Sequence, residues 1–336
     1  MGTSSLAKLK PSDHISHDWL ESAILNVCQK AFPSEDHLSV DSIAPREESV
    51  CPHQDYTFFL RSPDAEFRIL LRLHYGFFSF WQGTDDNKSW REFSILRHVY
   101  RLGYPAPFAY SFSGSCLPFG RSFVVMDPGD GERWEDFQDS FREVQEKIVD
   151  SMAEEMVKLH HSIEPAISIL EDVEIQPLFR LLWQRVSGLK DMGLERFFRA
   201  CEKRIQGLEP LDPVLVHGSM DLRNVLIQND YVRTVLNWEH AILGDPRWDV
   251  AYTKLAIQKE TDRSLANRFV ESYTNRAGME LHDLDIWEGL VALKMYALAQ
   301  WLKSLDDRSL FAVAGLRSLL LSWDDFFEEI TQAQFG

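Results

Sequence analysis

Two short segments of the chain concentrate side chains that could do chemistry. The first runs from His217 to Asn224 and the second from Asn237 to Glu239. Apolar, β-favouring residues flank both, so each is expected on a tight loop between strands. Polar side chains on a loop that a rigid scaffold holds are typical of a binding or catalytic site. The side chains concerned are those of Ser219, Asp221, Arg223, Asn224, Asn237 and Glu239.

These segments resemble the catalytic loop and metal-binding segment of the aminoglycoside phosphotransferase and choline kinase family, whose fold is that of protein kinases. The family pattern reads H-G-D-x-x-x-x-N, then I-D-W-E, then G-D-P-x-x-D. This chain has His-Gly-Ser at 217–219 with Asn224 at the same spacing, Leu-Asn-Trp-Glu at 236–239, and Gly-Asp-Pro-Arg-Trp-Asp at 244–249. The frame matches, but two acidic residues of the pattern are missing.

The two replaced acids are central to phosphoryl transfer, which depends on positioning and on electrostatics around metal ions. By the resemblance, Ser219 stands where a carboxylate orients the acceptor hydroxyl, and Asn237 stands where a carboxylate holds magnesium. A serine hydroxyl is no base near neutral pH without an activating partner. Asparagine keeps the shape of aspartate but loses the charge that a hard cation needs. Ordinary kinase chemistry is therefore not expected.

Asp221 is the acidic residue of the first segment, and it has two readings. Its carboxylate would repel a γ-phosphate, but it would suit binding an amine or moving a proton in a non-phosphoryl reaction. The alternative is an Asp that caps the loop. The resemblance makes His217 structural, bonded to loop backbone or to Asp249, and makes Asn224 a metal ligand or a loop brace. The resemblance leaves two interpretations of Glu239, as a polar side chain that contacts a ligand or as an exposed residue.

The resemblance also assigns nucleotide-binding positions in the first part of the chain. It places Arg72 where a basic residue touches phosphates, Glu92 where its helix-borne partner lies, and Met126 beside the hinge between lobes. An Arg72–Glu92 ion pair is expected, and it could equally brace strand to helix. The turn at 45–53 lacks the glycines of a phosphate cradle and carries two prolines and two glutamates, which argues against tight ATP binding.

The pattern of elements predicts an α+β, two-lobed, protein-kinase-like fold. Apolar periodicity predicts helices at 19–32, 90–102, 144–161, 178–189 and 194–208, and helices throughout the chain after Asp249. Alternation predicts strands at 38–40, 55–60, 66–73 and 121–126. A turn-rich segment at 127–131 resembles the family's hinge. We therefore expect an N-terminal lobe at 1–126 and a helical C-terminal lobe at 127–336.

Two other clusters invite chemistry but are better explained by packing. The aromatic run at 75–81 either covers the core or lines an apolar pocket, and core packing is favoured. His160 and His161 end a helix, where adjacent side chains point apart, so a paired metal site is not favoured. The four cysteines, Cys28, Cys51, Cys116 and Cys201, lie far apart without metal spacing. No metal ligands are assigned.

The composition of the chain limits the kinds of partner that it is expected to bind. The 336 residues carry a formal net charge of −17, which disfavours attraction to nucleic acid or anionic lipid. No apolar run reaches the roughly 20 residues of a membrane span. No secretory signal opens the chain, and the cysteine usage indicates a reducing compartment. We expect a cytoplasmic protein with a small-molecule substrate and neither nucleic acid nor membrane as partner.

Three functions remain open at this stage. The favoured one is an enzyme on a phosphotransferase-like scaffold, whose interlobe cleft performs a non-phosphoryl, biosynthetic acid–base reaction with Asp221, Ser219 and Asn224. Asn237, Glu239 and Arg223 would then contact the substrate, and no cofactor is expected. The second is a divergent ATP-dependent small-molecule kinase, which alone would need ATP and Mg²⁺. The third is a non-catalytic pseudokinase that binds a ligand.

Overall fold

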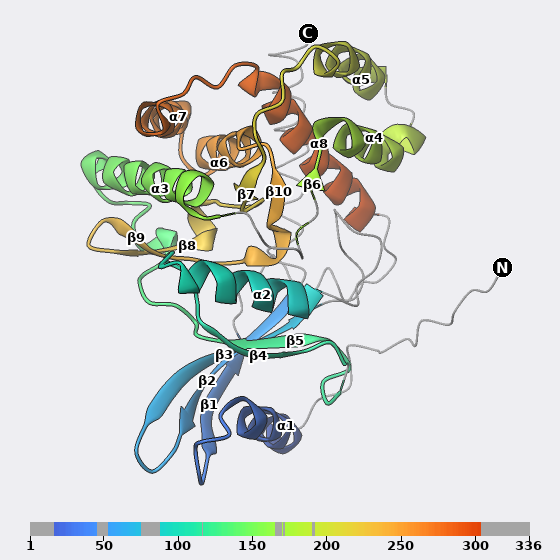
Figure 1. Ribbon diagram of the computed structural model, residues 1–336. Coiled ribbons are helices and arrows are strands. Elements are labelled where there is room, and N and C mark those ends of the chain that lie inside the picture. Colours follow the sequence, from blue (N-terminus) through green and yellow to red (C-terminus); the bar gives the residue numbers. More distant parts are fainter. Residues whose placement is uncertain are drawn as a thin grey trace, which may run out of the picture.

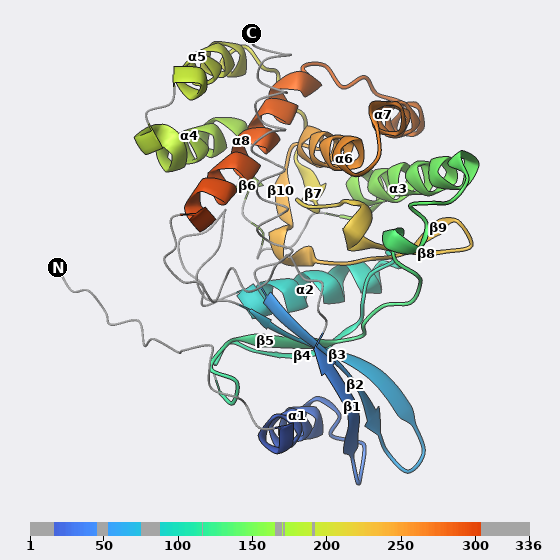
Figure 2. The same ribbon diagram turned by 180° about the vertical axis from the view of Figure 1, so that it is seen from behind.

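The computed structural model describes residues 17–45, 53–74, 88–115, 117–164, 170, 172–189 and 192–303. Figure 1 shows a lower lobe built on a β-sheet and an upper lobe made mainly of helices, with helix α2 (Lys88–Arg101) lying between them. Figure 2 gives the same arrangement from behind. The predicted α+β, kinase-like architecture is confirmed.

The lower lobe contains a five-stranded antiparallel sheet with the order β1-β2-β3-β5-β4. Strands β1 (Ser39–Pro45), β2 (His53–Arg61) and β3 (Glu66–His74) are the three predicted strands. Strand β5 (Phe123–Met126) pairs with β3 on one side and with β4 (Ala109–Ser113) on the other. Strand β4 was not predicted, because its sequence Ala-Tyr-Ser-Phe-Ser follows a proline-rich turn and lacks a run of apolar residues.

The two faces of this sheet have different roles. On β3, Ile69, Leu71 and Leu73 pack with helix α1 (His17–Ala31) in one apolar cluster. The alternate residue Leu70 joins the larger core that includes α2 and the upper lobe. Since side chains alternate across a strand, Arg72 and His74 share the face of Leu70 and point toward the junction of the lobes.

The upper lobe is built around α3 (Arg142–Ser162), which packs on α7 (Arg263–Ala277). Helix α6 (Arg247–Glu260) lies between α7 and α8 (Leu284–Lys303). Helices α4 (Ile175–Val186) and α5 (Met192–Ile205) contact α8 from the other side. The predicted helices of this lobe are present up to residue 303, and the rest of the region predicted as helical after Asp249 lies outside the described residues.

Short strands and turns of the upper lobe hold the two polar segments at the junction. Strand β7 (Val214–Val216) precedes the first segment, which runs through the 3₁₀ turn η4 (Leu222–Asn224) into β8 (Val225–Gln228). Strand β9 (Tyr231–Val235) pairs with β8 and leads into the second segment and the turn η5 (Trp238–His240). Strand β10 (Ile242–Gly244) then pairs with β7 and with β6 (Asp172–Val173).

Contacts across the expected boundary at 126 and 127 are extensive. The larger apolar core runs without a break from α2 and β5 into the upper lobe. The Val235 amide donates to the Pro105 carbonyl over 2.7 Å, and the Arg91 guanidinium donates to the Ala241 carbonyl. The division at this position remains a prediction, and the two lobes share one core.

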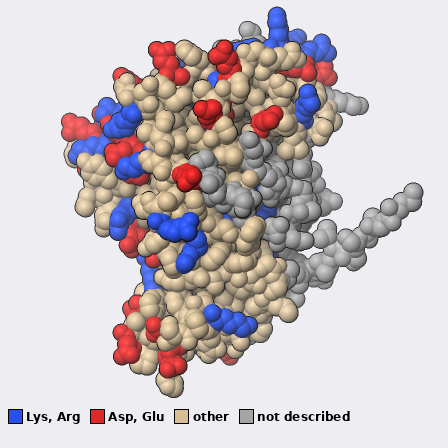
Figure 3. Space-filling model, viewed as in Figure 1, with Lys and Arg blue, Asp and Glu red and all other residues tan. Residues whose placement is uncertain are grey.

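One face of the molecule shows how its charged side chains are distributed. On the face drawn in Figure 3, acidic and basic side chains of the described residues are intermixed over both lobes. Among the described helices, none is long and apolar enough to cross a membrane. The aromatic run at 75–81 and most of the turn at 45–53 lie outside the described residues.

Candidate functional site

A buried carboxylate fixes the start of the first polar segment. Asp249, at the beginning of α6, accepts hydrogen bonds from the backbone amides of His217 (2.6 Å) and Gly218 (2.7 Å). Its Oδ2 also lies 3.2 Å from Nε2 of His160. Gly218 has φ +82°, and a Cβ there would collide with the His240 carbonyl. This loop therefore needs glycine and a buried acceptor to keep its shape.

The His217 side chain braces one loop against the other, as the resemblance implied. Its Nε2 donates to the Leu236 carbonyl over 2.9 Å, and its Nδ1 accepts from the Ser219 amide over 3.3 Å. Burial lowers the pKa of His217, although Asp249 opposes the shift, so the imidazole is held neutral. His160 is likewise buried and bonded to Tyr273 and Asp249, while His161 is exposed, so the packing interpretation of this pair holds.

Ser219 and Asp221 occupy the centre of the first segment but differ in their contacts. The Ser219 Oγ is buried and accepts or donates no hydrogen bond among the described residues. Asp221 caps η4, because its Oδ1 accepts from the amides of Arg223 (3.0 Å) and Asn224 (2.9 Å). Its Oδ2 accepts from the Tyr252 hydroxyl over 3.3 Å. Burial raises the pKa of Asp221 to about 6, against the opposing effect of Arg223.

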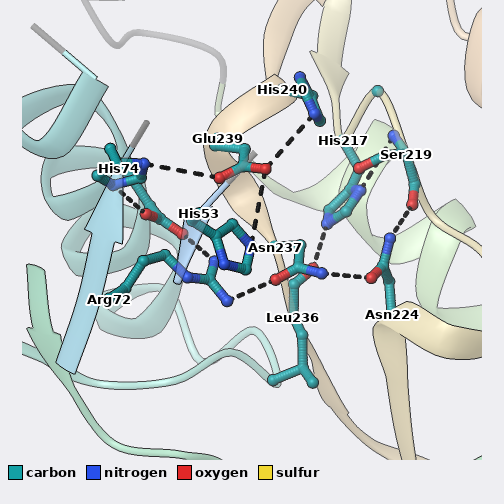
Figure 4. Close-up of polar contacts among 12 residues, drawn as sticks. His53, Arg72, His74, His217, Ser219, Asn224, Leu236, Asn237, Glu239 and His240 are labelled. Carbon is teal, nitrogen blue, oxygen red and sulfur yellow. Dashed lines mark hydrogen bonds and ion pairs between the residues drawn. The ribbon is translucent and has the colours of Figure 1, made fainter. Parts of the chain in front are cut away.

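The two asparagines that stand at metal-ligand positions by resemblance bind each other (Figure 4). Asn237 adopts the left-handed conformation (φ 62°, ψ 63°), which asparagine tolerates better than most residues. Its Nδ2 donates to Oδ1 of Asn224, and its Oδ1 accepts from Nη2 of Arg72 over 2.6 Å. Asn224 in turn donates to the Ser219 carbonyl over 2.7 Å. Both side-chain oxygens are thus engaged by N–H donors.

Arg72 is the cation at the centre of the junction. It donates from Nε and Nη2 to Asp55 (3.1 and 2.9 Å) and from Nη1 to Glu92 (2.7 Å), so the predicted Arg72–Glu92 pair exists. All three side chains are at most 4% exposed. Burial alone would raise the pKa of both carboxyls. Arg72 and the neighbouring histidines have the opposite effect, so the pKa of Glu92 is lowered to about 2 and the pKa of Asp55 is held well below its usual value.

Three histidines surround Glu239 beside this ion pair (Figure 4). His53 and His74 face each other across β2 and β3, and Glu239 and His240 come from η5. The Glu239 side chain is only 5% exposed, so the reading of Glu239 as an exposed residue is wrong. Burial, together with Lys294 and Arg91, lowers the pKa of His240 well below its usual value.

Two of the predicted site residues lie in other surroundings. Met126 is buried at the end of β5, opposite Leu70 and Ala109, as part of the larger core. Arg223 pairs with Glu260 on α6 over 2.8 Å. A nucleotide contact for Met126 and a substrate contact for Arg223 remain predictions.

Sequence reasoning missed four charged or titratable residues at the junction. His53, Asp55 and His74 could have been found from the alternation of β2 and β3, which places them on the face of Arg72. Lys294 could have been noticed as a lysine inside an apolar helix. It is 4% exposed, its Nζ lies 3.5 Å from the Gly218 carbonyl, and burial lowers its pKa to about 7.

Comparison with known proteins agrees with this geometry. The profile of the phosphotransferase enzyme family matches residues 79–282, which is more than half of the chain. The chain therefore belongs to this family, and the resemblance to aminoglycoside phosphotransferases is confirmed. None of the curated proteins compared with it matches the chain.

Solved structures show which folds it is similar to. A thermostable mutant of aminoglycoside phosphotransferase APH(4)-Ia, in ternary complex with ADP and hygromycin B, is 13% identical, with 94% of this chain and 99% of that chain covered and a TM-score of 0.63. The streptomycin–ATP complex of APH(2″)-IIa is 17% identical, with 86% and 95% covered and a TM-score of 0.56. At these identities the likeness establishes the fold alone.

The junction combines two kinds of chemistry. Arg72, Asn237 and Asn224 form a series of hydrogen bonds that continues to the Ser219 carbonyl and uses both amide side-chain oxygens as acceptors. Asp221 and the histidines around Glu239 are groups that can exchange protons or bind a softer metal. At the family motif, amide oxygens replace a carboxylate, and three imidazoles surround the remaining carboxylate of Glu239.

Proposed function

We propose that this chain carries out acid–base chemistry on a small molecule between its lobes and does not transfer a phosphoryl group from Mg²⁺-ATP. The observation that carries the proposal is the bonding of Asn237. Its Oδ1 accepts from Arg72 and its Nδ2 donates to Oδ1 of Asn224. Each of the two oxygens that would coordinate magnesium by resemblance therefore already accepts a hydrogen bond, one of them from the guanidinium that would touch phosphate.

The residues at these positions do not fit a magnesium-nucleotide complex. Mg²⁺ needs oxygen ligands and is usually held by one or two carboxylates. Ser219 and Asn237 are neutral where the family pattern has acids. Asp245, which could have served instead, is bonded to the Arg247 backbone and guanidinium at 2.6–2.9 Å. The proposed reaction uses neither ATP nor Mg²⁺.

Asp221 is the group proposed to move the proton. A general acid or base works best when its pKa lies near the working pH, and burial raises that of Asp221 to about 6. One oxygen caps η4, while the other has only the long 3.3 Å bond from Tyr252 among the described residues. The unbonded Ser219 hydroxyl and the Asn224 amide would position the substrate.

A working kinase is the second candidate, because the family and the related structures favour it. The complexes of APH(4)-Ia and APH(2″)-IIa contain ADP and ATP together with hygromycin B and streptomycin. Carried over to this chain, they suggest a small polar substrate and a nucleotide. Such a kinase would have to hold its metal with Asp221 or Glu239.

Thermal unfolding with and without Mg²⁺-ATP separates these functions. A ligand at a hundredfold excess over its Kd stabilises the folded state by about 2.7 kcal/mol, which gives a clear shift in Tm. We expect no shift for the natural chain. The double variant Ser219→Asp, Asn237→Asp serves as the matched gain-of-binding control and should acquire one. A shift in the natural chain would disprove the proposal.

Identifying the substrate comes next. Native mass spectrometry of the purified protein should reveal a co-purifying small molecule, which then serves in turnover assays. Asp221→Asn should abolish the limb of the pH–rate profile near pH 6. Asp262→Asn is the matched control, because Asp262 caps α7 by the same pair of backbone bonds away from the junction. If both variants changed the pH–rate profile equally, Asp221 would only cap the turn, as in a non-catalytic binding protein.

A further inference from the structure

Glu239 is a buried carboxylate without the hydrogen bonds that such a group needs. Both of its oxygens are inaccessible, and neither accepts a hydrogen bond from the described residues. Instead, three imidazole nitrogens surround it at longer range, as Figure 4 shows: His240 Nε2 at 3.5 Å, His74 Nδ1 at 3.8 Å and His53 Nε2 at 3.9 Å. A buried carboxylate left in this state costs several kcal/mol unless a ligand compensates it.

The opposite nitrogens of two of these histidines already have partners. His53 Nδ1 lies 2.9 Å from Asp55, and His74 Nε2 lies 3.0 Å from Glu92. Histidines that bind metals almost always place one ring nitrogen against a carboxylate, carbonyl or water, which orients the ring and makes the other nitrogen a better ligand. His53 is oriented in this way toward Glu239, whereas the His74 ring lies between Glu92 and Glu239, which are the two carboxylates of the candidate metal group.

The charges of the cluster point in the same direction. Three buried carboxylates, those of Asp55, Glu92 and Glu239, lie around one guanidinium, that of Arg72, which contacts the first two directly. With neutral histidines the four side chains sum to a charge of −2. A divalent cation would bring the buried group to neutrality, and burial of unbalanced charge is what proteins avoid.

We propose that His74, Glu92 and Glu239 bind one divalent transition-metal ion, with His53 and His240 beside Glu239. Each of the three residues offers a ligand atom within 4.8 Å of the other two. In a tetrahedral site, ligands about 2.0–2.2 Å from a zinc ion lie about 3.3–3.6 Å apart, so the side chains would move together by roughly an ångström on binding the ion. Mixed imidazole and carboxylate ligands suit zinc and its first-row neighbours better than magnesium.

This site differs from the magnesium position that the family motif implies, because neither Asn224 nor Asn237 belongs to it. It is also independent of the proposed reaction, since metal binding can be measured without turnover. The competing explanation is that protons on the histidines balance Glu239. In that case the cluster is an ion-pair network that holds no metal.

Zinc binding to the full chain tests the proposal. The protein is stripped with a chelator, dialysed and titrated with Zn²⁺ by calorimetry, and the bound metal is counted by mass spectrometry. We expect one ion per chain, with at least a tenfold loss of affinity in Glu239→Gln and in His74→Asn. The matched control is Glu280→Gln with His282→Asn, because Glu280 and His282 form a similar pair at 3.5 Å on the surface. That variant should bind zinc normally.

A second measurement uses the natural chain, so its outcome does not depend on whether the variants fold. X-ray absorption at the zinc edge should show nitrogen ligands from imidazole together with carboxylate oxygens. Absence of stoichiometric zinc, an all-oxygen ligand set, or equal loss of binding in the surface variant would overturn the proposal. Circular dichroism of each variant identifies those that are folded and can therefore be compared.

Discussion

Asp249 and Glu239 are both buried carboxylates of the family motif, and their surroundings differ. Asp249 is fully buried and accepts two backbone hydrogen bonds of 2.6 and 2.7 Å, with His160 beside it. Glu239 is 5% exposed on its side chain and accepts none among the described residues. The first carboxylate is part of the loop it holds, whereas the second has its lone pairs available. Hydrogen-bond satisfaction thus separates a structural acid from a ligand-binding one within a single motif.

The largest effect should follow from removing the satisfied carboxylate. Asp249→Ala leaves the His217 and Gly218 amides without acceptors, each at a cost of about 1–3 kcal/mol, so unfolding free energy should fall by about 3–5 kcal/mol. Urea unfolding followed by circular dichroism measures it. A loss below about 1 kcal/mol would mean that the loop does not depend on Asp249.

The next-largest loss of unfolding free energy is expected at Gly218, whose backbone amide donates to Asp249. Gly218→Ala places a side chain at φ +82° and against the His240 carbonyl, and strained positions of this kind cost about 1–3 kcal/mol. The same urea titration applies. Gly278→Ala is the control, because Gly278 also has positive φ (+65°) but nothing within 4 Å of a Cβ. It should cost less than Gly218→Ala.

Asp221 should give a smaller, pH-dependent effect. Its folded pKa of about 6 exceeds the unfolded value of about 3.9, so its contribution to stability is present below pH 4 and is lost as pH rises through 6. Between pH 4 and pH 7, the unfolding free energy of the natural chain should therefore fall by about 1–2 kcal/mol relative to that of Asp221→Asn, allowing for partial exposure.

The control for this pH series is Asp262→Asn. Hydrogen bonding to Arg142 lowers the pKa of Asp262 to about 2, so its contribution is present above the unfolded pKa and is lost only as pH falls toward 2. Between pH 5 and 7 the difference between this variant and the natural chain should stay constant. A pH-dependent difference of equal size in both variants would contradict the assignment to Asp221.

The smallest effect is expected for the unsatisfied carboxylate. In metal-free protein, Glu239→Gln removes both the cost of burying this charge and its attraction to Arg72 and the histidines, and because these effects oppose each other, unfolding free energy should change by less than about 1 kcal/mol. This is the direct counterpart of Asp249→Ala. If both substitutions cost several kcal/mol, the distinction between the two carboxylates fails.

Much of this structure was predictable because local patterns and the global fold agree. The frame from His217 to Asp249 indicated the fold, the bracing role of His217 and the existence of the Arg72–Glu92 ion pair, whose role was left open. Strand alternation could also have indicated the face on which Arg72 lies. Contacts between distant segments were not predictable in the same way, because pairing of β2 with β3 decides that His53 and His74 meet.

The partners of Asn237 were also beyond sequence reasoning. The residue type shows that a negative charge is missing, but only the folded chain places Oδ1 against Arg72, a hundred and sixty-five residues away. Asp221 illustrates the same point, since its sequence position left capping and catalysis open. The structure establishes the cap through the Arg223 and Asn224 amides and leaves catalysis to experiment.

The bond from Arg72 to Asn237 also joins the two lobes. It ties the sheet of one lobe to the loop of the other, alongside the backbone bond between Pro105 and Val235. A hydrogen bond from a charged group contributes about 1.5–3 kcal/mol, which reduces a hinged-open population roughly ten- to hundredfold. Separation of the two lobes at this point would therefore require that bond to break.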